Sequence, residues 1–96
     1  MYWLENLNNS MLEINYKPSF ICSYDEAEVS LREEIKEKIS LFRNKNNHKS
    51  LKVHKLHGSL KDCYSFSVNY RIRIVFEYLS KNEVSLLAVG DHDLYK

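Results

Sequence analysis

Apolar and polar residues alternate along CYSFSVNYRIRIVFEYL, residues 63–79. Such alternation predicts β-strand with one buried face. Because this run exceeds the usual strand length of about 3–10 residues, a hairpin must interrupt it. For the apolar residues on both sides to share one face, the turn must hold an odd number of residues. Asn69, Tyr70 and Arg71 meet this condition, and Asn69 can take a left-handed conformation. The shared core face is then Phe66, Val68, Ile72, Ile74 and Phe76.

This hairpin places Ser67 opposite Arg73, on the face of the sheet away from the apolar residues. The next segment, EVSLLAV at residues 83–89, is apolar on both faces and is typical of a central strand. A turn over residues 80–82 joins the two. Counting across that turn predicts Arg73 opposite Val89. We therefore expect Asp91 and His92 near Arg73.

The first half of the chain predicts one strand and two helices. MLEINYK, residues 11–17, alternates as a half-buried strand does. From Pro18 onward, apolar residues recur every three or four positions and form one helical stripe. An acidic cluster and a capping box from Ser30 to Glu33 favour a break, giving helices over 18–26 and 29–44. The order β-α-α-β-β-β predicts an α+β domain, with a two-helix hairpin packed on a small antiparallel sheet.

Length and composition are those of one soluble domain. The 96 residues are 44% hydrophobic and 28% charged, with only two glycines and one proline. We expect the domain to span residues 11–96, with residues 1–10 as an N-terminal extension that is disordered or results from a start upstream of Met11. No apolar run approaches the roughly 20 residues that cross a bilayer, and the first ten residues do not resemble a signal peptide. We therefore expect a cytoplasmic protein without a membrane partner, in which Cys22 and Cys63 are reduced thiols.

The net charge of +1 hides an uneven distribution of charge. Acidic residues gather between Asp25 and Glu37, whereas no acidic residue occurs from Arg43 to Lys61. The basic segment contains Arg43, Lys45, Lys49, Lys52, Lys55 and Lys61, with His48, His54 and His57 between them. Such a segment suits a polyphosphate ligand such as a nucleic acid, because each cation that neutralises a phosphate releases counterions. A solvated basic loop is the alternative.

The chain closes with VGDHDLYK, residues 89–96, in which His92 lies between two aspartates. A histidine beside carboxylates can be held in one tautomer, which suits proton transfer, although a polar strand end is the simpler reading. Arg73 lies in an apolar strand, where a guanidinium usually binds an anion or pairs with a carboxylate such as Asp91. His54 and His57 have H-x-x-H spacing, but lysines surround them and no cysteine joins them. We therefore expect no metal and no cofactor.

Two longer stretches resemble a known family. SLKVHKLHGSLKDCYSFSVNYRIRIVFEY, residues 50–78, and LLAVGDHDLY, residues 86–95, resemble the RelE/ParE superfamily of toxins from bacterial type II toxin–antitoxin systems. The resemblance is to the RelE/StbE and YafQ-like members and runs from residue 11 to residue 96. The combination H-K-L-x-G, S-F-x-V, R-I-V-F and G-x-H-D-x-Y, in this order, is specific to the group.

The resemblance implies a RelE-like fold and a ribosome-dependent mRNA endoribonuclease. Such toxins cut mRNA in the ribosomal A site by 2'-hydroxyl transesterification, and a cognate antitoxin protein neutralises them. ParE members have the same fold but inhibit DNA gyrase by binding. A ParE-type inhibitor and a catalytically weak RNA-binding member are therefore the alternatives.

The resemblance also implies roles for single residues. Arg73 matches the phosphate-binding arginine of the superfamily, His92 matches the histidine of the YafQ-like closing motif, and His54 matches an upstream histidine. Tyr95 falls near an aromatic position that holds or stacks the substrate. The substrate-binding candidates are Arg71, Lys52, Lys55, His57, Lys61 and Ser67. The sequence departs from the YafQ pattern at two of these positions, because Ser67 replaces a histidine and Arg71 replaces an aspartate.

Overall fold

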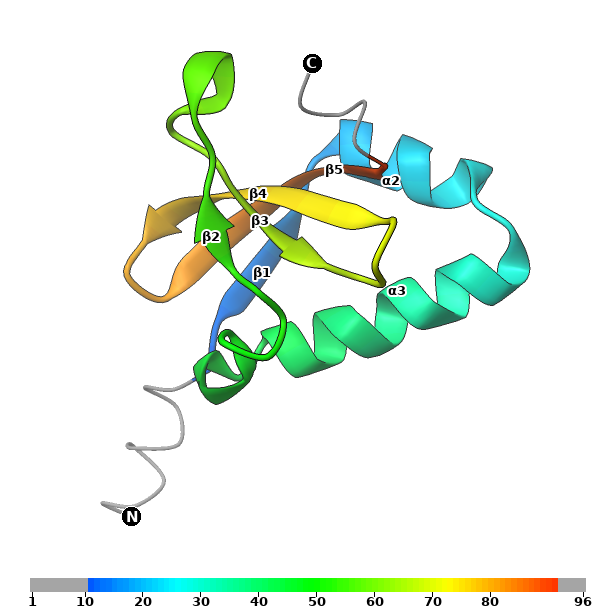
Figure 1. Ribbon diagram of the computed structural model, residues 1–96, viewed down its shortest axis with the longest axis horizontal. Helices are drawn as coiled ribbons and strands as arrows, with labels where there is room; N and C mark the ends of the chain where they lie inside the picture. Colours follow the sequence, from blue (N-terminus) through cyan, green and yellow to red (C-terminus); the bar gives the residue numbers. More distant parts are fainter. Residues whose placement is uncertain (1–10, 92–96) are drawn as a thin grey trace.

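The computed structural model describes residues 11–91 and shows two helices packed on a five-stranded sheet (Figure 1). The elements in chain order are β1 (Glu13–Tyr16), α2 (Pro18–Glu26), α3 (Val29–Phe42), the 3-10 turn η1 (Lys45–Asn47), β2 (His54–Lys55), the 3-10 turn η2 (Gly58–Leu60), β3 (Tyr64–Ser67), β4 (Arg73–Ser80) and β5 (Glu83–Gly90). The expected α+β architecture is therefore confirmed.

The sheet is mixed, so the expectation of an antiparallel sheet is wrong for one strand pair. The strand order is β1-β5-β4-β3-β2, and β1 runs parallel to β5 while the other pairs are antiparallel. Alternation along residues 11–17 identifies a strand but does not identify its neighbour. The short strand β2 was not expected, because two residues are too few to show a period.

The register of the β3–β4 hairpin is as predicted, with Ser67 opposite Arg73. The prediction that Arg73 lies opposite Val89 is wrong by one residue, because Arg73 pairs with Gly90. The pairing of Phe76 with Leu86 agrees with the register that was predicted for β4 and β5. The next pair toward Arg73 joins Val75 to Ala88, so Leu87 is an extra residue on β5. The sequence does not reveal such a bulge here, because the segment is apolar on both faces and shows no alternation that an extra residue would interrupt.

Asn69 shapes the hairpin turn in a different way from the one expected. Among the described non-glycine residues only Lys52 has a positive φ, of 59°, so Asn69 is not left-handed. Its side-chain oxygen instead accepts hydrogen bonds from the backbone N–H groups of Arg71 and Ile72, at 2.9 and 2.8 Å. This is an Asx turn, in which the side chain does the work of a backbone carbonyl.

The break between the helices is confirmed, but not the capping box. Ala27 and Glu28 have extended backbones, and Glu28 is the N-cap residue of α3 without a side-chain capping bond. Ser30 therefore lies inside the helix rather than before it. The second helix ends at Phe42 instead of residue 44, because the Asn44 side chain accepts from the N–H of Asn46 and starts η1.

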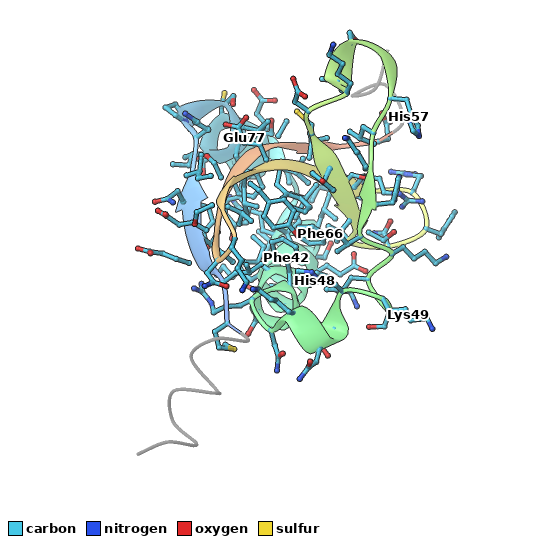
Figure 2. The ribbon with its side chains drawn as sticks, turned by 90° about the vertical axis from the view of Figure 1, so that its left-hand side faces the viewer. Phe42, His48, Lys49, His57, Phe66 and Glu77 are labelled. Carbon is cyan, nitrogen blue, oxygen red and sulfur yellow. The ribbon has the colours of Figure 1, made fainter. Side chains whose placement is uncertain are left out.

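One core joins both helices to the sheet. Phe42 of α3 stacks on Phe66 of β3 with 4.1 Å between ring centroids and meets the edge of Phe76 at 4.8 Å. Figure 2 shows Phe42 and Phe66 at the centre of the molecule. Phe20 of α2 belongs to the same buried cluster. Within residues 11–91, no helix is both long and apolar enough to cross a bilayer.

Candidate functional site

The face of the sheet away from the helices carries a set of polar residues. Paired residues on neighbouring strands point to the same face, so the register puts His54 beside Ser65, Ser67 beside Arg73, and Glu77 beside Ser85. We call this the polar face; it comprises His54, Ser65, Ser67, Arg73, Glu77 and Ser85, of which Ser65 and Ser85 are buried. Three expected site residues, His54, Ser67 and Arg73, are thus brought to one face.

Arg73 begins β4, where the turn holds its side chain. Its Nη1 donates to the carbonyl oxygens of Asn69, at 2.6 Å, and Ile72, at 3.3 Å. The side chain is half-buried, and its partner on β5 is Gly90, which adds no side chain to this face. One edge of the guanidinium is therefore anchored to the turn, which leaves donors that could bind a phosphate.

His54 lies on β2, two strands from Arg73. Its Nδ1 is 2.9 Å from the carbonyl oxygen of Lys52, and its Nε2 is 3.5 Å from the hydroxyl of Ser65. The imidazole is exposed, whereas Ser65 is fully buried. His54 pairs with Ser65 and Arg73 with Ser67, so the two residues lie two strand spacings apart across the sheet, roughly 10 Å, and two residues apart along it, roughly 7 Å. A phosphodiester could lie between the two side chains.

Four of the expected substrate-binding residues, three lysines and one histidine, follow the edge of the sheet beside β2. Lys52, Lys55, His57 and Lys61 are all exposed. Figure 2 shows Lys49 near one end of this edge and His57 near the other. We call the surface from Lys49 to Lys61 the basic edge. It borders the polar face on the side of His54, so a nucleic-acid backbone could contact both.

Arg71 lies apart from these residues. It is exposed in the β3–β4 turn and lines a groove of about 760 Å³ together with Glu26, Glu28 and Glu34. Glu34 also accepts a hydrogen bond from the side-chain amide of Asn69, at 3.0 Å. An arginine among three carboxylates is a poor phosphate ligand, so the structure does not group Arg71 with Arg73.

Two expected catalytic residues, His92 and Tyr95, lie outside the described residues. The described chain reaches Asp91, which is exposed and follows Gly90, the β5 partner of Arg73. The last described residues therefore lie next to Arg73.

Both cysteines are free thiols; Cys22 is exposed and Cys63 is partly buried. Burial raises the pKa of the Cys63 thiol, and the nearby carboxylates of Glu77 and Asp62 raise it further. The thiol of Cys63 therefore stays protonated at neutral pH. Over residues 11–91, no three histidine, cysteine or acidic side chains gather in a way that could hold a metal ion.

Sequence reasoning missed the contribution of two residues. Asn69 was expected only to form a turn, yet its carbonyl oxygen also anchors Arg73. The available signal was an asparagine three residues before Ile72, a spacing that an Asx turn uses. Lys52 was expected to bind substrate through its ammonium group, yet it has a left-handed backbone and its carbonyl contacts His54. A lysine in that conformation has no sequence signature.

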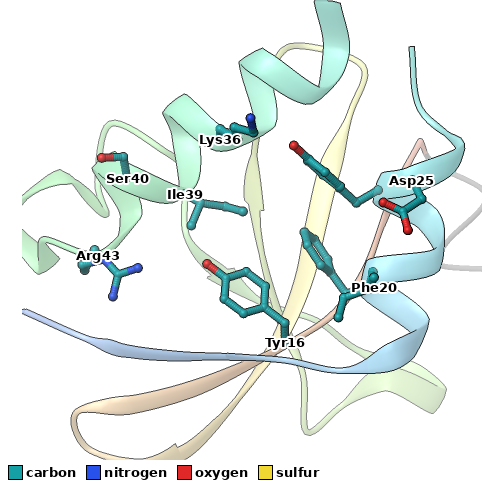
Figure 3. A pocket seen from close by; sticks show the side chains of 9 residues that line it. Tyr16, Phe20, Asp25, Lys36, Ile39, Ser40 and Arg43 are labelled. Atoms are coloured by element: carbon teal, nitrogen blue, oxygen red, sulfur yellow. The ribbon is translucent and has the colours of Figure 1, made fainter. Parts of the chain in front are cut away.

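A second groove opens on the helix side of the molecule, between β1, α2 and α3 (Figure 3). It holds about 460 Å³, and its walls carry Tyr16, Phe20, Ile21, Tyr24 and Ile39. Lys36 and Arg43 lie at its α3 side, and Asp25 lies at the opposite end, on α2. Tyr16 and Ile21 are 42% and 47% exposed, which is high for large apolar side chains. We call this the helix groove.

The sequence matches no family profile and no curated protein. Solved structures with the same fold do exist. A conserved hypothetical protein, HP0894, from Helicobacter pylori is 23% identical with a TM-score of 0.67, and the match covers 86% of this chain and 97% of that one. YafQ from E. coli is 18% identical with a TM-score of 0.67, covering 86% and 96%. YoeB in its complex with YefM from Staphylococcus aureus is 24% identical with a TM-score of 0.63, covering 84% and 97%.

These structures confirm the fold that the sequence resemblance implied. The matches cover almost the whole length of each solved chain and most of this one. The protein therefore has the RelE-like fold of YafQ and YoeB.

Proposed function

We propose that the protein is the toxin of a type II toxin–antitoxin system and cuts mRNA on the ribosome. The observation that carries the proposal is that His54, Ser67 and Arg73 share the polar face, next to the basic edge. The sequence resemblance to RelE and YafQ-like toxins points to the same activity, and the fold agrees with it.

The proposed reaction is the attack of an mRNA 2'-hydroxyl on the adjacent phosphorus. The O2'–P bond forms while the P–O5' bond breaks, which leaves a 2',3'-cyclic phosphate and a free 5'-hydroxyl. Arg73 would neutralise the charge that builds up on the phosphate oxygens. His54 would take the proton from the 2'-hydroxyl, and His92 would return a proton to the leaving O5'. Tyr95 would stack on a base, and the basic edge would bind the flanking phosphates.

The proposed protein partner is an antitoxin that occupies the helix groove. YoeB from Staphylococcus aureus forms a toxin–antitoxin complex with YefM. The apolar walls of the groove suit a segment with large apolar side chains, and Lys36 and Arg43 suit carboxylates on that segment. We therefore assign the groove to an acidic, amphipathic stretch of the antitoxin.

A gyrase inhibitor is the second candidate function. One structure with this fold is described as a YoeB/ParE toxin, from Agrobacterium tumefaciens, at 15% identity and a TM-score of 0.60. The serine at position 67 and the arginine at position 71 depart from the YafQ pattern, which favours this alternative.

Induced expression with pulse labelling separates the two functions. An mRNA-cutting toxin stops incorporation of labelled amino acids first, while DNA synthesis continues. If incorporation of labelled thymidine falls first and protein synthesis continues, the protein is a gyrase inhibitor and the proposal of an endoribonuclease is wrong. A strain that expresses Arg73→Ala serves as the control, because it should grow normally in the first case.

A further inference from the structure

The loop before β2 ends in a helix-terminating motif with Lys52 at its left-handed position. The N–H of Val53 bonds to the carbonyl of His48 at 3.0 Å, and the N–H of Lys52 bonds to the carbonyl of Lys49 at 3.1 Å. These two hydrogen bonds, together with a left-handed residue directly before Val53, form the Schellman motif. Glycine is the usual residue at that position, because a Cβ disfavours a positive φ. Here Lys52 has a φ of 59°.

The left-handed turn directs the carbonyl of Lys52 at the next histidine. Its oxygen lies 2.9 Å from Nδ1 of His54. A carbonyl oxygen only accepts hydrogen bonds, so Nδ1 must carry the proton. In a neutral imidazole the other nitrogen, Nε2, then has a free lone pair. Nε2 is the nitrogen that lies 3.5 Å from the Ser65 hydroxyl.

We propose that the left-handed backbone of Lys52 fixes His54 in the Nδ1–H tautomer and thereby makes Nε2 its proton acceptor. Lys52 is then a positioning residue that acts through its carbonyl oxygen, in addition to any contact of its ammonium group with RNA. The inference deepens the proposed function, since the general base for the 2'-hydroxyl needs an unprotonated nitrogen. The proton passes from O2' to Nε2 as the O2'–P bond forms.

The direct test is the tautomer of His54 in the full-length protein, read from its ring ¹⁵N shifts by NMR. The measurement is made at about pH 8.5, above the usual titration range of imidazoles. His54→Gln assigns the signals among the four histidines of the chain. The proposal expects a protonated Nδ1 and an unprotonated Nε2. A wild-type His54 in the Nε2–H form overturns it, whatever the protein does to RNA.

Two variants separate the backbone of Lys52 from its charge. Lys52→Gly accepts the positive φ and should keep the Nδ1–H form, whereas the β-branched Lys52→Val disfavours that φ and should shift His54 toward the Nε2–H form. Both variants lack the ammonium group, so the difference between them reports the backbone alone. Equal tautomer populations in the two variants contradict the proposal. Ser65→Ala is the control and should leave the Nδ1–H form in place.

Cleavage assays then connect the tautomer to the proposed reaction. Lys52→Val should cut mRNA on programmed ribosomes roughly 10²-fold more slowly than Lys52→Gly, the lower end of the range for loss of general base catalysis. Equal rates, with tautomers that differ, would overturn the role of the tautomer in catalysis. If no variant cuts RNA and wild-type His54 is still Nδ1–H, the proposed function fails and the positioning of His54 stands.

Discussion

Asn69 connects the β3–β4 turn to both the helices and the candidate site. Its side-chain oxygen binds the N–H groups of Arg71 and Ile72, its amide nitrogen donates to Glu34 of α3, and its carbonyl accepts from Arg73. A single residue thus fixes the turn conformation and one edge of the guanidinium. The sequence predicted where this turn falls. It could not predict the bond between Asn69 and Glu34, because the two residues lie 35 positions apart in the chain.

Replacing Asn69 tests this connection. Asn69→Ala removes three side-chain hydrogen bonds and should lower the free energy of unfolding by about 1–3 kcal/mol. Urea denaturation followed by circular dichroism measures the loss. Tyr70→Ala is the control, because Tyr70 is 88% exposed and its removal should change stability by less than about 0.5 kcal/mol. Equal stability of the two variants would show that the Asx turn contributes nothing.

His48 predicts a pH dependence of stability. Its Nε2 lies 2.8 Å from the carbonyl of Phe42, and its ring stacks on Phe42 at 4.7 Å. Burial lowers its pKa below 6.5; the hydrogen bond to Phe42 opposes this, and nearby Lys45 adds to it. The unfolded chain therefore binds a proton more readily than the folded protein. The contribution of His48 to the free energy of unfolding is therefore present above about pH 6.5 and decreases as the pH drops below that value.

The control for this pH effect is a variant that does not titrate at this position. His48→Gln keeps a side-chain amide that can donate to the Phe42 carbonyl. Its stability should change less between pH 7.5 and 5.5 than that of the wild type, as measured by thermal unfolding at both pH values. An identical pH dependence in the two proteins would mean that other groups cause the acid loss.

Among the elements, β5 departs most from its predicted form. Leu87 is an extra residue opposite the pair Val75 and Phe76, and its carbonyl accepts a hydrogen bond from the Ser19 hydroxyl of α2 at 2.5 Å. The bulge thus gives the sheet a contact with the first helix. Alternation predicted β3 and β4 and most of their register, because each has one apolar face. It could not predict the bulge in LLAV, because every residue there is apolar and a shift in alternation cannot be seen. Nor could it predict the parallel pairing of β1, which leaves the alternation unchanged.

The contact between α2 and the bulge can be tested with two serines of the same helix. Ser19→Ala should lower the free energy of unfolding by about 1 kcal/mol, because the Leu87 carbonyl loses its donor. Ser23→Ala removes only a bond to the carbonyl of Ser19 within the helix and should change stability by less than about 0.5 kcal/mol. Chemical denaturation of both variants measures the difference. Equal losses would mean that the bulge does not need Ser19.

At the scale of the whole molecule, the candidate substrate and antitoxin surfaces lie on different faces of the sheet. The polar face lies opposite the helices, the basic edge borders it beside β2, and the helix groove lies between β1 and the helices. The separation predicts that an antitoxin could hold the groove while its remaining chain reaches the polar face. Sequence patterns found the basic segment but not the groove. The walls of the groove come from three elements, and the periodicity of their apolar residues predicts only burial in the core.

An exposed groove residue and a matched exposed residue elsewhere test the antitoxin assignment. Ile21→Ser should weaken binding of the cognate antitoxin roughly tenfold or more, because Ile21 lines the groove. Val29→Ser, at a 65% exposed position that does not line the groove, should leave the affinity unchanged. Isothermal titration calorimetry with the purified partner measures both. Equal affinities for the two variants would place the antitoxin elsewhere.

In the proposed function, Arg73 on the polar face takes part in cutting mRNA. The most direct measurement is single-turnover cleavage of mRNA in the A site of programmed ribosomes, by the wild type, Arg73→Ala and Arg71→Ala. We expect Arg73→Ala to lose roughly 10²–10³-fold in rate while remaining folded, because a preorganised cation at the transition state is lost. Arg71→Ala removes the same charge two residues away, from a position beside three glutamates, and should lose far less. A wild type that leaves the mRNA intact, or an Arg73→Ala variant that cuts as fast as the wild type, would contradict the account.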